Sequence, residues 1–230
     1  MNIIQRFTLT GSVAVITGGG RGIGRAIALA YAQAGADVVL AARTLSDVEA
    51  VADAVRDLGR RALAVQCDVN EAEQRAALIT RAREHMGRIT HLVNNAGGAG
   101  PNDPLTLTVE RFEEIMRFNV SSAYHLTQLC VPHMRDAGGN IINITSGAAR
   151  YAQTQFSAYG TAKAALSHMT RLLAQDFAPQ VRVNAIAPGP ILTDALNRVL
   201  PVPMRESMIK ATPLHSLGEP DDIAAAALYL

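Results

Sequence analysis

The sequence predicts one α/β domain built around an open, doubly wound parallel sheet. Along its 230 residues, short apolar runs alternate six times with segments of helical periodicity, which is the pattern of consecutive βα units. The apolar runs are continuous and do not alternate with polar residues, as expected for parallel strands buried on both faces. No linker, charge run or shift in composition divides the chain, so we expect residues 1–230 to form a single domain.

The apolar runs define the expected strands in chain order. The first, SVAVIT, leads into a glycine-rich loop, and DVVLAA and ALAVQ are short and strongly apolar. The later runs, HLVNNAG, NIINITS and VRVNAIAPG, end in polar or glycine-containing segments. The six expected strands cover residues 12–17, 37–42, 62–66, 91–97, 140–146 and 181–189.

Helical periodicity fills the intervals between these strands. The segment GRAIALAYAQAG follows the first strand. Ser46 and Glu49 have the spacing of a capping box that opens the second helix, which continues to about Leu58. The remaining helical segments are expected at 71–87, at 157–178 and over a long region, with or without an interruption, at 108–136.

The C-terminal part of the chain has two different patterns. Residues 190–218 are rich in Pro and Met and follow no single period. Pro220 then opens a last helix, and Asp221 and Asp222 suit its start because acidic side chains are favourable at the positive end of the helix dipole.

Composition excludes several classes of partner. Net charge is +1 and the basic residues are scattered, which argues against a nucleic-acid or anionic-membrane partner. No apolar run reaches about 18 residues, so no spanning helix is expected, and the N-terminus lacks the pattern of a signal peptide. Cys67 and Cys130 are far apart and form no CxxC pair, which favours reduced thiols in a cytoplasmic protein.

Polar and glycine-rich segments follow the predicted strands. Ligands bind at the carboxyl ends of the strands in open α/β sheets, so these segments are expected to form one site. They are Thr17–Gly24, Arg43, Asp68, Asn94–Gly100, Ser146 and Pro188–Thr193.

The loop TGGGRGIG, at residues 17–24, fits neither common phosphate-binding motif. No register supplies the glycine spacing GxGxxG, and Arg25 and Ala26 stand where a P-loop needs Lys and then Ser or Thr. The loop could be only a tight turn. Its place between the first strand and the first helix favours a cofactor site, because free N–H groups and the helix dipole attract a pyrophosphate there.

Two arginines indicate which dinucleotide is bound. NAD sites commonly have an acid at the end of the second strand, but this chain has Ala42 followed by Arg43. Arg43, with Arg21 in the glycine loop, would suit a 2′-phosphate because guanidinium groups bind phosphate with a planar fork of donors. NADP(H) is therefore favoured over NAD(H), although Arg43 could also be a solvated surface residue.

Ser146, Tyr159 and Lys163 form a candidate proton-transfer group. Tyr159 and Lys163 lie four residues apart and therefore share one face of a helix. A cation beside a phenol favours the phenolate and lowers a pKa that is ordinarily near 10. Tyr159 could then exchange a proton with a carbonyl or an alcohol, while Ser146 holds the substrate oxygen. An ordinary helix pair is the alternative, since YxxxK alone is common.

With these motifs in order, the chain resembles the short-chain dehydrogenase/reductase family, in its main branch of about 250 residues, and the likeness extends over essentially the whole chain. TGGGRGIG is similar to the TGxxxGxG cofactor loop of that Rossmann-like fold. CDV, NNAG, FNV and PGPILT are similar to four further family segments. The cofactor contacts that the resemblance and the loop argument imply are Gly18, Arg21, Gly22, Ile23, Gly24, Arg43, Asp68, Val69, Asn95, Ala96, Gly97, Tyr159, Lys163, Pro188, Gly189, Ile191 and Thr193.

The resemblance also implies a mechanism without a metal. Tyr159 would be the general acid/base, Lys163 would lower its pKa and bind the nicotinamide ribose, and Ser146 would orient the substrate oxygen. Asn119 would be the fourth catalytic residue, bending its helix and holding a water that links Lys163 to solvent. The six histidines show no ligand spacing and are interpreted as surface or packing residues.

The resemblance implies a seventh strand after the last helix, whereas the sequence stops at Leu230, so either the sequence is truncated or its end is not represented. The family also forms homo-oligomers, so a dimer or tetramer is expected.

The substrate is expected to be a secondary alcohol or ketone, with a hydroxysteroid or other bulky apolar molecule favoured. The segment after the sixth strand is apolar, with Met204 and Met208 flanked by Leu196, Val199 and Leu200, which suits a lid. These side chains could equally pack the lid onto the body. NNAGGAGP and PGPILTDAL are similar to bacterial 7α-hydroxysteroid dehydrogenases, for which the resemblance implies an Asp at the Ala42 position and NAD.

Two alternatives remain open. A 3-oxoacyl carrier-protein reductase has nearly the same motifs but would need a basic patch for its acidic partner, and Arg171 and Arg182 are isolated in the sequence. A non-catalytic NAD(P)-binding regulator would normally have lost a catalytic residue, whereas all four are present.

Overall fold

Six parallel strands form one sheet in the computed structural model, which describes residues 2–193, 196 and 202–230. The strand order is β3-β2-β1-β4-β5-β6, so the chain crosses from one edge of the sheet back to its centre between β3 and β4. In the central pairs, Val15 of β1 lies opposite Val39 of β2 and Leu92 of β4. The strands are β1 Val13–Thr17, β2 Asp37–Ala42, β3 Ala62–Gln66, β4 His91–Asn94, β5 Gly139–Ile144 and β6 Val181–Ile186.

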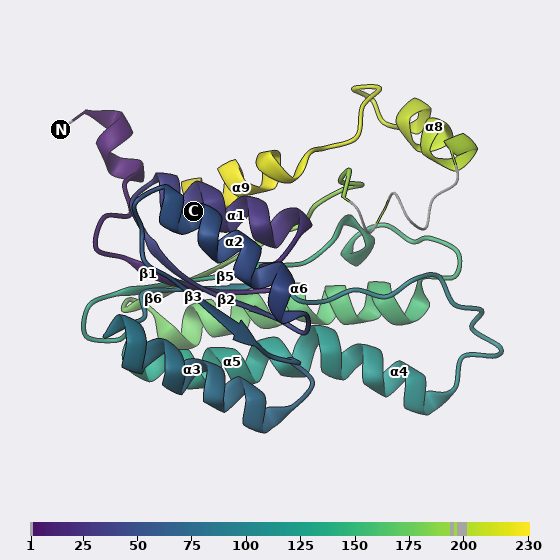
Figure 1. The fold of residues 1–230 in the computed structure, drawn as a ribbon. Helices are drawn as coiled ribbons and strands as arrows, with labels where there is room; N and C mark the ends of the chain where they lie inside the picture. Colours follow the sequence, from purple (N-terminus) through teal and green to yellow (C-terminus); the bar gives the residue numbers. More distant parts are fainter. Residues whose placement is uncertain (1, 194–195, 197–201) are drawn as a thin grey trace.

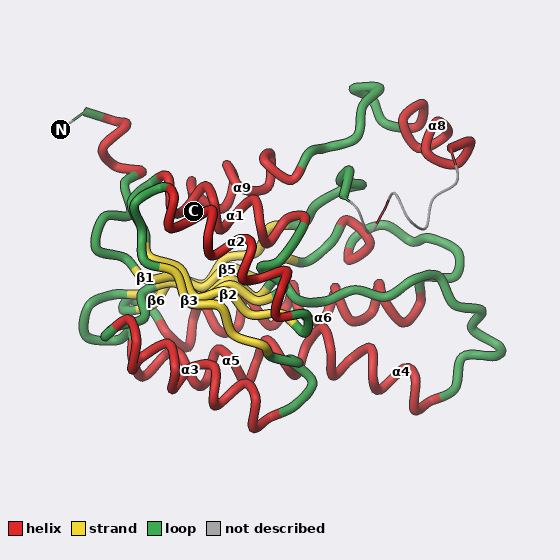
Figure 2. Tube along the Cα trace, in the orientation of Figure 1, coloured by secondary structure: helices red, strands yellow, loops and turns green. Residues whose placement is uncertain are grey.

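Helices cover both faces of this sheet. Figure 1 shows α1, α2 and α9 over one face and α3, α5 and α6 over the other, with α4 extending beyond the sheet. Figure 2 shows the same three layers, with the strands enclosed between two layers of helix. The helices on the first face are α1 Gly22–Gln33, α2 Leu45–Asp57 and α9 Pro220–Tyr229. Those of the second face are α3 Ala72–Met86, α4 Val109–Met116, α5 Ser122–Cys130 and α6 Ser157–Phe177.

Covered on both faces, the strands are apolar along most of their length, and β1 is the clearest case. Along β1, Val13 and Val15 belong to the core beneath α3, α5 and α6, whereas Ala14 and Ile16 belong to the core beneath α1, α2 and α9. All four are at most 1% exposed. This packing is the physical reason for the continuous apolar runs in the sequence.

Short helical elements complete the description. They are the 3₁₀ helices η1 Ile3–Phe7, η3 Val131–His133 and η4 Gly147–Ala149, the π-helical turn η2 Arg117–Ser121 and the helix α8 Val202–Ala211. In the described part of the chain, no helix is both long and apolar enough to cross a membrane.

Several predicted boundaries need correction. The expected helix at 108–136 is divided into α4, η2, α5 and η3, with a π-helical turn between α4 and α5. The predicted capping box is wrong: α2 begins at Leu45 after Thr44, so Ser46 already lies in the first helical turn. The strands expected at 91–97 and 181–189 end at Asn94 and Ile186, where the chain leaves the sheet to form loops.

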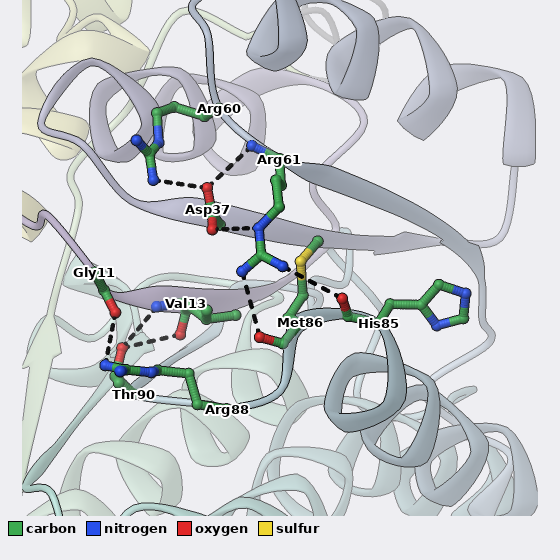
Figure 3. A network of polar contacts seen from close by, with 9 residues as sticks. All are labelled: Gly11, Val13, Asp37, Arg60, Arg61, His85, Met86, Arg88 and Thr90. Atoms are coloured by element: carbon green, nitrogen blue, oxygen red, sulfur yellow. Dashed lines mark hydrogen bonds and ion pairs between the residues drawn. The ribbon is translucent and has the colours of Figure 1, made fainter.

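A polar network fixes the amino-terminal end of β2, far from the loops that follow the strands. Figure 3 shows the Asp37 carboxylate between two arginines, with Oδ1 2.8 Å from Arg60 Nη2 and Oδ2 2.8 Å from Arg61 Nε. Arg61 also donates to the carbonyl oxygens of Met86 and His85, at 3.3 and 3.5 Å. Burial raises the pKa of the Asp37 carboxyl, but the Arg61 hydrogen bonds and both positive charges outweigh it and leave the pKa below its ordinary value.

Candidate active site

The ends of β1 and β4 are joined by hydrogen bonds between Thr17 and Asn95. The buried Thr17 hydroxyl accepts from the backbone N–H of Asn95, at 3.1 Å, and of Ala96, at 3.0 Å. In return, Asn95 Nδ2 donates to the carbonyl oxygens of Thr17, at 2.9 Å, and Gly18, at 3.1 Å. The strand order reverses between these two strands, which is where open α/β sheets place their ligand crevice.

Two glycines of the loop are required by this close packing. Gly18 has φ +63°, and a Cβ there would lie 2.7 Å from Asn95 Nδ2. A Cβ at Gly24 would lie 2.6 Å from the same nitrogen and collide with the carbonyl oxygen of Gly18. The absence of a side chain at Gly18 and Gly24 therefore lets Asn95 lie against the loop.

The amino-terminal end of α1 lies beside the loop that follows β6. Arg21 is the N-cap of α1 and makes no side-chain capping bond, so its side chain leaves the first-turn amides free, and no other side chain in the described part of the chain caps them. A Cβ at Gly22 would lie 3.3 Å from Thr193 Cγ2, so Thr193 touches this helix start. Uncapped amides, with the positive dipole, fit an anionic phosphate.

A cavity of about 630 Å³ adjoins the ends of β2, β3 and β4. The Asp68 carboxylate lies at its wall, where Oδ1 accepts from the backbone N–H and the side-chain amide of Asn70, at 2.9 and 3.1 Å. The exposed Arg43 guanidinium also lines it and makes no hydrogen bond or ion pair within the described residues. The full lining is Arg43, Asp68, Asn70, Glu71, Gly98, Arg111, Glu114, Ile115, Arg117 and Phe118.

The predicted catalytic residues Ser146, Tyr159 and Lys163 lie side by side. Ser146 follows β5 and shares a side-chain hydrogen bond with Tyr159. Tyr159 and Lys163 project from one face of α6, with Lys163 Nζ 5.8 Å from the centre of the Tyr159 ring. Lys163 is 4% exposed, and Nζ donates to the carbonyl oxygen of Ile144 at 2.9 Å, which fixes the ammonium below the end of β5.

Asn119 is held in the π-helical turn between α4 and α5. Its Nδ2 donates to the carbonyl oxygens of Ile115, at 2.9 Å, and Gly98, at 3.2 Å, and its Oδ1 accepts from Gly98 N at 2.8 Å. A Cβ at Gly97 would lie 2.8 Å from Asn119 Oδ1 and 3.0 Å from Lys163 Nζ. Gly97 is thus the point at which Asn119 comes close to Lys163.

The environment of the phenol differs from the sequence-based expectation. Burial raises the pKa of Tyr159, and the hydrogen bond with Ser146 lowers it only in part. Burial also lowers the pKa of Lys163 to about 8. The expected lowering of the Tyr159 pKa is therefore wrong for the surroundings that the chain itself supplies, because desolvation outweighs the neighbouring groups.

Some residues predicted to touch a cofactor direct their side chains elsewhere. Val69 belongs to the core, and its carbonyl oxygen accepts from Arg75. Ile23 and Ile191 are partly buried and pack against the opposite core. Pro188 is buried, and its carbonyl oxygen accepts from Gly147 N at 2.8 Å, while the adjoining Gly189 is exposed.

Sequence reasoning missed two residues that organise the site. Thr17 joins the strand ends and could have been recognised as the first residue of TGGGRGIG. Gly98 holds Asn119 through its backbone, and no residue type marks that role.

A second cavity, of about 800 Å³, lies at the amino-terminal ends of β4, β5 and β6. Tyr31, His91, Asn140 and Arg182 line it, and it contains none of the predicted site residues. Within the described ranges, no three His, Cys, Asp or Glu side chains are grouped to hold a metal.

Known proteins resemble this chain in sequence and in fold. Residues 12–201 match the family described as short chain dehydrogenase. The chain belongs to the short-chain dehydrogenase/reductase family. The sequence motifs predict this family and a nicotinamide-dependent oxidoreductase, and both predictions are confirmed.

Individual relatives agree over nearly the whole chain. An uncharacterized oxidoreductase of Mycobacterium tuberculosis (strain CDC 1551 / Oshkosh) is 52% identical over 231 residues, covering 99% of this chain and 88% of that protein. The 7α-hydroxysteroid dehydrogenase of Escherichia coli (strain K12) is 42% identical over 224 residues, covering 96% of this chain and 88% of that enzyme.

A solved relative shows the same fold. A 7α-hydroxysteroid dehydrogenase complexed with NADH and 7-oxo glycochenodeoxycholic acid superposes with a TM-score of 0.96, at 41% identity, covering 100% of this chain and 91% of that one. The predicted Rossmann-like parallel sheet of this short-chain dehydrogenase/reductase is confirmed. The residues of this chain fit a nicotinamide dinucleotide, with the uncapped start of α1 for the pyrophosphate and Asp68 at the adjoining cavity.

Proposed function

We propose that this enzyme catalyses hydride transfer between a nicotinamide cofactor and a secondary alcohol or ketone of a hydroxysteroid or similarly bulky apolar molecule. The observation that carries the proposal is a chain of contacts: Ser146 lies against Tyr159, Tyr159 against Lys163, and Lys163 meets Asn119 beside Gly97. Likeness to a 7α-hydroxysteroid dehydrogenase supports the substrate class.

Each of the four residues has a proposed role. The bound nicotinamide supplies or accepts the hydride. Tyr159 gives its proton to the carbonyl oxygen during reduction and takes it back during oxidation, while Ser146 holds that oxygen by a hydrogen bond. The raised pKa of Tyr159 keeps the phenol protonated at neutral pH, which suits the reductive direction. The ammonium of Lys163 favours the phenolate that remains after transfer.

Asn119 has a supporting role in the proposal. Its amide makes one hydrogen bond to Ile115 in the preceding helical turn and two to Gly98 in the loop after β4, which hold the π-helical turn against that loop. We propose that a water at this bend links Lys163 to solvent, so that the proton lost from Tyr159 can be replaced.

The proposed cofactor is NADP(H), bound with its 2′-phosphate at Arg43 and Arg21. Both side chains are exposed, and neither makes an ion pair in the described part of the chain. The end of β2 has Ala42, so no carboxylate there repels a phosphate. The other proposed contacts are the loop residues Gly18, Gly22 and Gly24, the strand-end residues Asp68, Asn95, Ala96 and Gly97, and Thr193.

An apolar substrate is supported by α8. This helix has no buried residue, and Val202 and Met204 are 56% and 55% exposed. In Figure 1, α8 stands on the side of the loops that follow the strands. Apolar side chains that do not pack onto the body suit a cover for an apolar ligand better than a fixed part of the core. Val199 and Leu200, which the sequence assigns to this lid, lie outside the described residues.

The carrier-protein alternative lacks support from one of the two arginines considered for it. Arg182 lines the cavity at the opposite end of the sheet, where its guanidinium donates to the carbonyl oxygen of Leu230. It therefore cannot contribute to a basic patch beside Tyr159. We also propose that the enzyme acts as a homo-oligomer in the cytoplasm, as the family resemblance implies.

A substrate panel tests the proposal. The purified enzyme is given hydroxysteroids, 3-oxoacyl thioesters and small ketones, each with NAD(H) and NADP(H), and the reduced nicotinamide is followed by absorbance. The highest kcat/KM is expected for a hydroxysteroid with NADP(H). Preference for a thioester would favour the carrier-protein reductase, and no turnover with any substrate class would favour the non-catalytic regulator.

A further inference from the structure

The backbone at Gln155 is in a conformation that its side chain does not favour. Gln155 has φ +67°, and the described residues contain one other non-glycine residue with positive φ, His215. Left-handed backbone at a residue other than Gly, Asn or Asp costs on the order of 1 kcal/mol and persists where the surrounding structure imposes it. Such strain occurs most often beside functional sites, and Gln155 lies four residues before Tyr159.

The next residue, Phe156, contacts the phenol. Its ring centre lies 6.1 Å from that of Tyr159, at an interplanar angle of 68°, which is an edge-to-face arrangement. Phe156 is the N-cap residue of α6, and its carbonyl oxygen accepts from Gly160 N at 2.7 Å. The start of α6 therefore fixes the backbone of Phe156, which directly follows Gln155, and so fixes where the ring lies.

Gln155 is bonded to the loop on the other side of the site. Its carbonyl oxygen accepts from Asn102 N at 2.8 Å, and Asn102 belongs to the loop between β4 and α4. The same loop carries Gly97 and Gly98 at its start, which contact Asn119. The bond thus joins the segment before α6 to the loop that contributes the other half of the site.

A second contact keeps this loop on α6. Ala99 and Leu107 of the loop pack against the cluster that includes Ala158 and Ala162 of α6. These two alanines flank Tyr159 in the sequence of the helix. With the loop held to α6 by packing and to Gln155 by a hydrogen bond, the backbone that aims Phe156 has little freedom to relax.

We propose that Phe156 is a positioning residue that covers one side of the Tyr159 phenol, and that the left-handed backbone of Gln155 and its bond to Asn102 hold it there. This inference rests on the proposed role of Tyr159 in proton transfer. The ring excludes water from the phenol and limits its orientation. Burial is the largest contribution to the raised pKa of Tyr159, which agrees with a covering group at this position.

Replacement of the ring tests the covering role. Phe156→Leu is expected to lower kcat about tenfold, because a misdirected phenol loses alignment with its substrate. The midpoint assigned to Tyr159 in the pH profile of kcat/KM is expected to move to lower pH, since desolvation is reduced. Phe156→Tyr, which keeps the ring, is expected to restore both values. Phe7→Leu is a matched control, because Phe7 pairs with Tyr229 at 6.4 Å near the amino-terminal ends of the strands.

The backbone is tested at Gln155. Gln155→Gly is expected to keep kcat, because glycine adopts positive φ readily. Gln155→Val is expected to lower kcat and shift the pH midpoint as Phe156→Leu does, because a β-branched residue is strongly disfavoured there. Since Gln155 acts through Phe156, the double variant Gln155→Val/Phe156→Leu should lose no more than the larger single loss.

The outcomes separate the two proposals. Turnover retained in Tyr159→Phe would overturn the proposed function itself. Loss of turnover in Tyr159→Phe, with kcat or the pH midpoint unchanged in Phe156→Leu, would overturn only the role of Phe156. Thermal unfolding of each variant establishes that a lost activity comes from a folded enzyme, and a Phe156→Leu protein that unfolds early is replaced in the comparison by Phe156→Met.

Discussion

Asn119 and Lys163 converge on the Cα of Gly97, although 44 residues separate them in the chain. A Cβ at Gly97 would approach both Asn119 Oδ1 and Lys163 Nζ to 3.0 Å or less. Asn119 cannot yield easily because three hydrogen bonds hold its amide. Among the described residues, the ammonium of Lys163 has one hydrogen bond, to the carbonyl oxygen of Ile144, so a group added at Gly97 displaces it more readily than the Asn119 amide.

Gly97→Ala should therefore impair the chemical step. We expect kcat to fall at least tenfold because Lys163 moves away from Tyr159. Gly100→Ala is the matched control, since a Cβ at Gly100 would meet no atom within 4 Å. Steady-state kinetics of both variants test this, and equal kcat values would argue against a close contact at Gly97.

Arg43→Asp should reverse the cofactor preference. A carboxylate in place of the exposed guanidinium repels a 2′-phosphate and can bind a 2′-hydroxyl. We expect the ratio of kcat/KM for NADP to that for NAD to fall at least tenfold. Arg135→Asp makes the same charge change at an exposed position after η3 and outside the cavity. An unchanged ratio in Arg43→Asp would contradict the assignment of the phosphate site.

Lys163 should make stability depend on pH in the alkaline range. Burial lowers its pKa in the folded protein to about 8, below its ordinary value of 10.5. Between these values the unfolded chain binds more protons than the folded one, so the contribution of Lys163 to the free energy of unfolding rises with pH.

Lys163→Met should remove this contribution. We expect the rise in the free energy of unfolding between about pH 8 and pH 10 to be smaller in the variant than in the parent, as measured by urea unfolding at several pH values. Lys210→Met, which removes an exposed lysine, is the control. If the free energy of unfolding changes with pH in the same way in the parent and in Lys163→Met, the ammonium of Lys163 is not desolvated.

Asp37→Asn should destabilise the fold without affecting the site. The amide keeps the shape of the carboxyl but leaves Arg60 and Arg61 without their ion-pair partner, at a cost of about 1–3 kcal/mol. The folded pKa of Asp37 is lowered, so its contribution is present above the unfolded pKa and is lost as pH falls through the folded pKa.

Unfolding at neutral and acidic pH tests this. The difference between Asp37→Asn and the parent should be large at pH 7 and should shrink below about pH 4. Asp53→Asn removes the partner of an exposed ion pair with Arg56 and should cost less than about 1 kcal/mol at either pH. Equal effects of the two substitutions would contradict the importance of the network in Figure 3.

The sheet could be predicted because strands that are buried on both faces have continuous apolar runs in the sequence. Val13, Ala14, Val15 and Ile16 are all buried, and each could be recognised as apolar. The start of α2 could not be placed from Ser46 and Glu49, because the same residue types occur within a first turn as well as at its cap.

The site was predictable only in part. The motifs predict which residues follow the strands. The spacing of residues in the sequence does not show how deeply a side chain is buried, so it does not predict that burial raises the pKa of Tyr159. The conformation of Gln155 and the place of Phe156 could not be predicted from the sequence either. Positive φ at a glutamine has no residue signature, and the hydrogen bond that holds it joins Gln155 to Asn102, which is far away in the chain.

Tyr159→Phe is the measurement that tests the account most directly. The substitution removes one oxygen and keeps the ring against Phe156 and Lys163. We expect that turnover of the best substrate is abolished while cofactor affinity, measured by titration calorimetry, stays within about threefold of the parent value. Substantial turnover by the folded variant would contradict the assignment of Tyr159 as the proton donor.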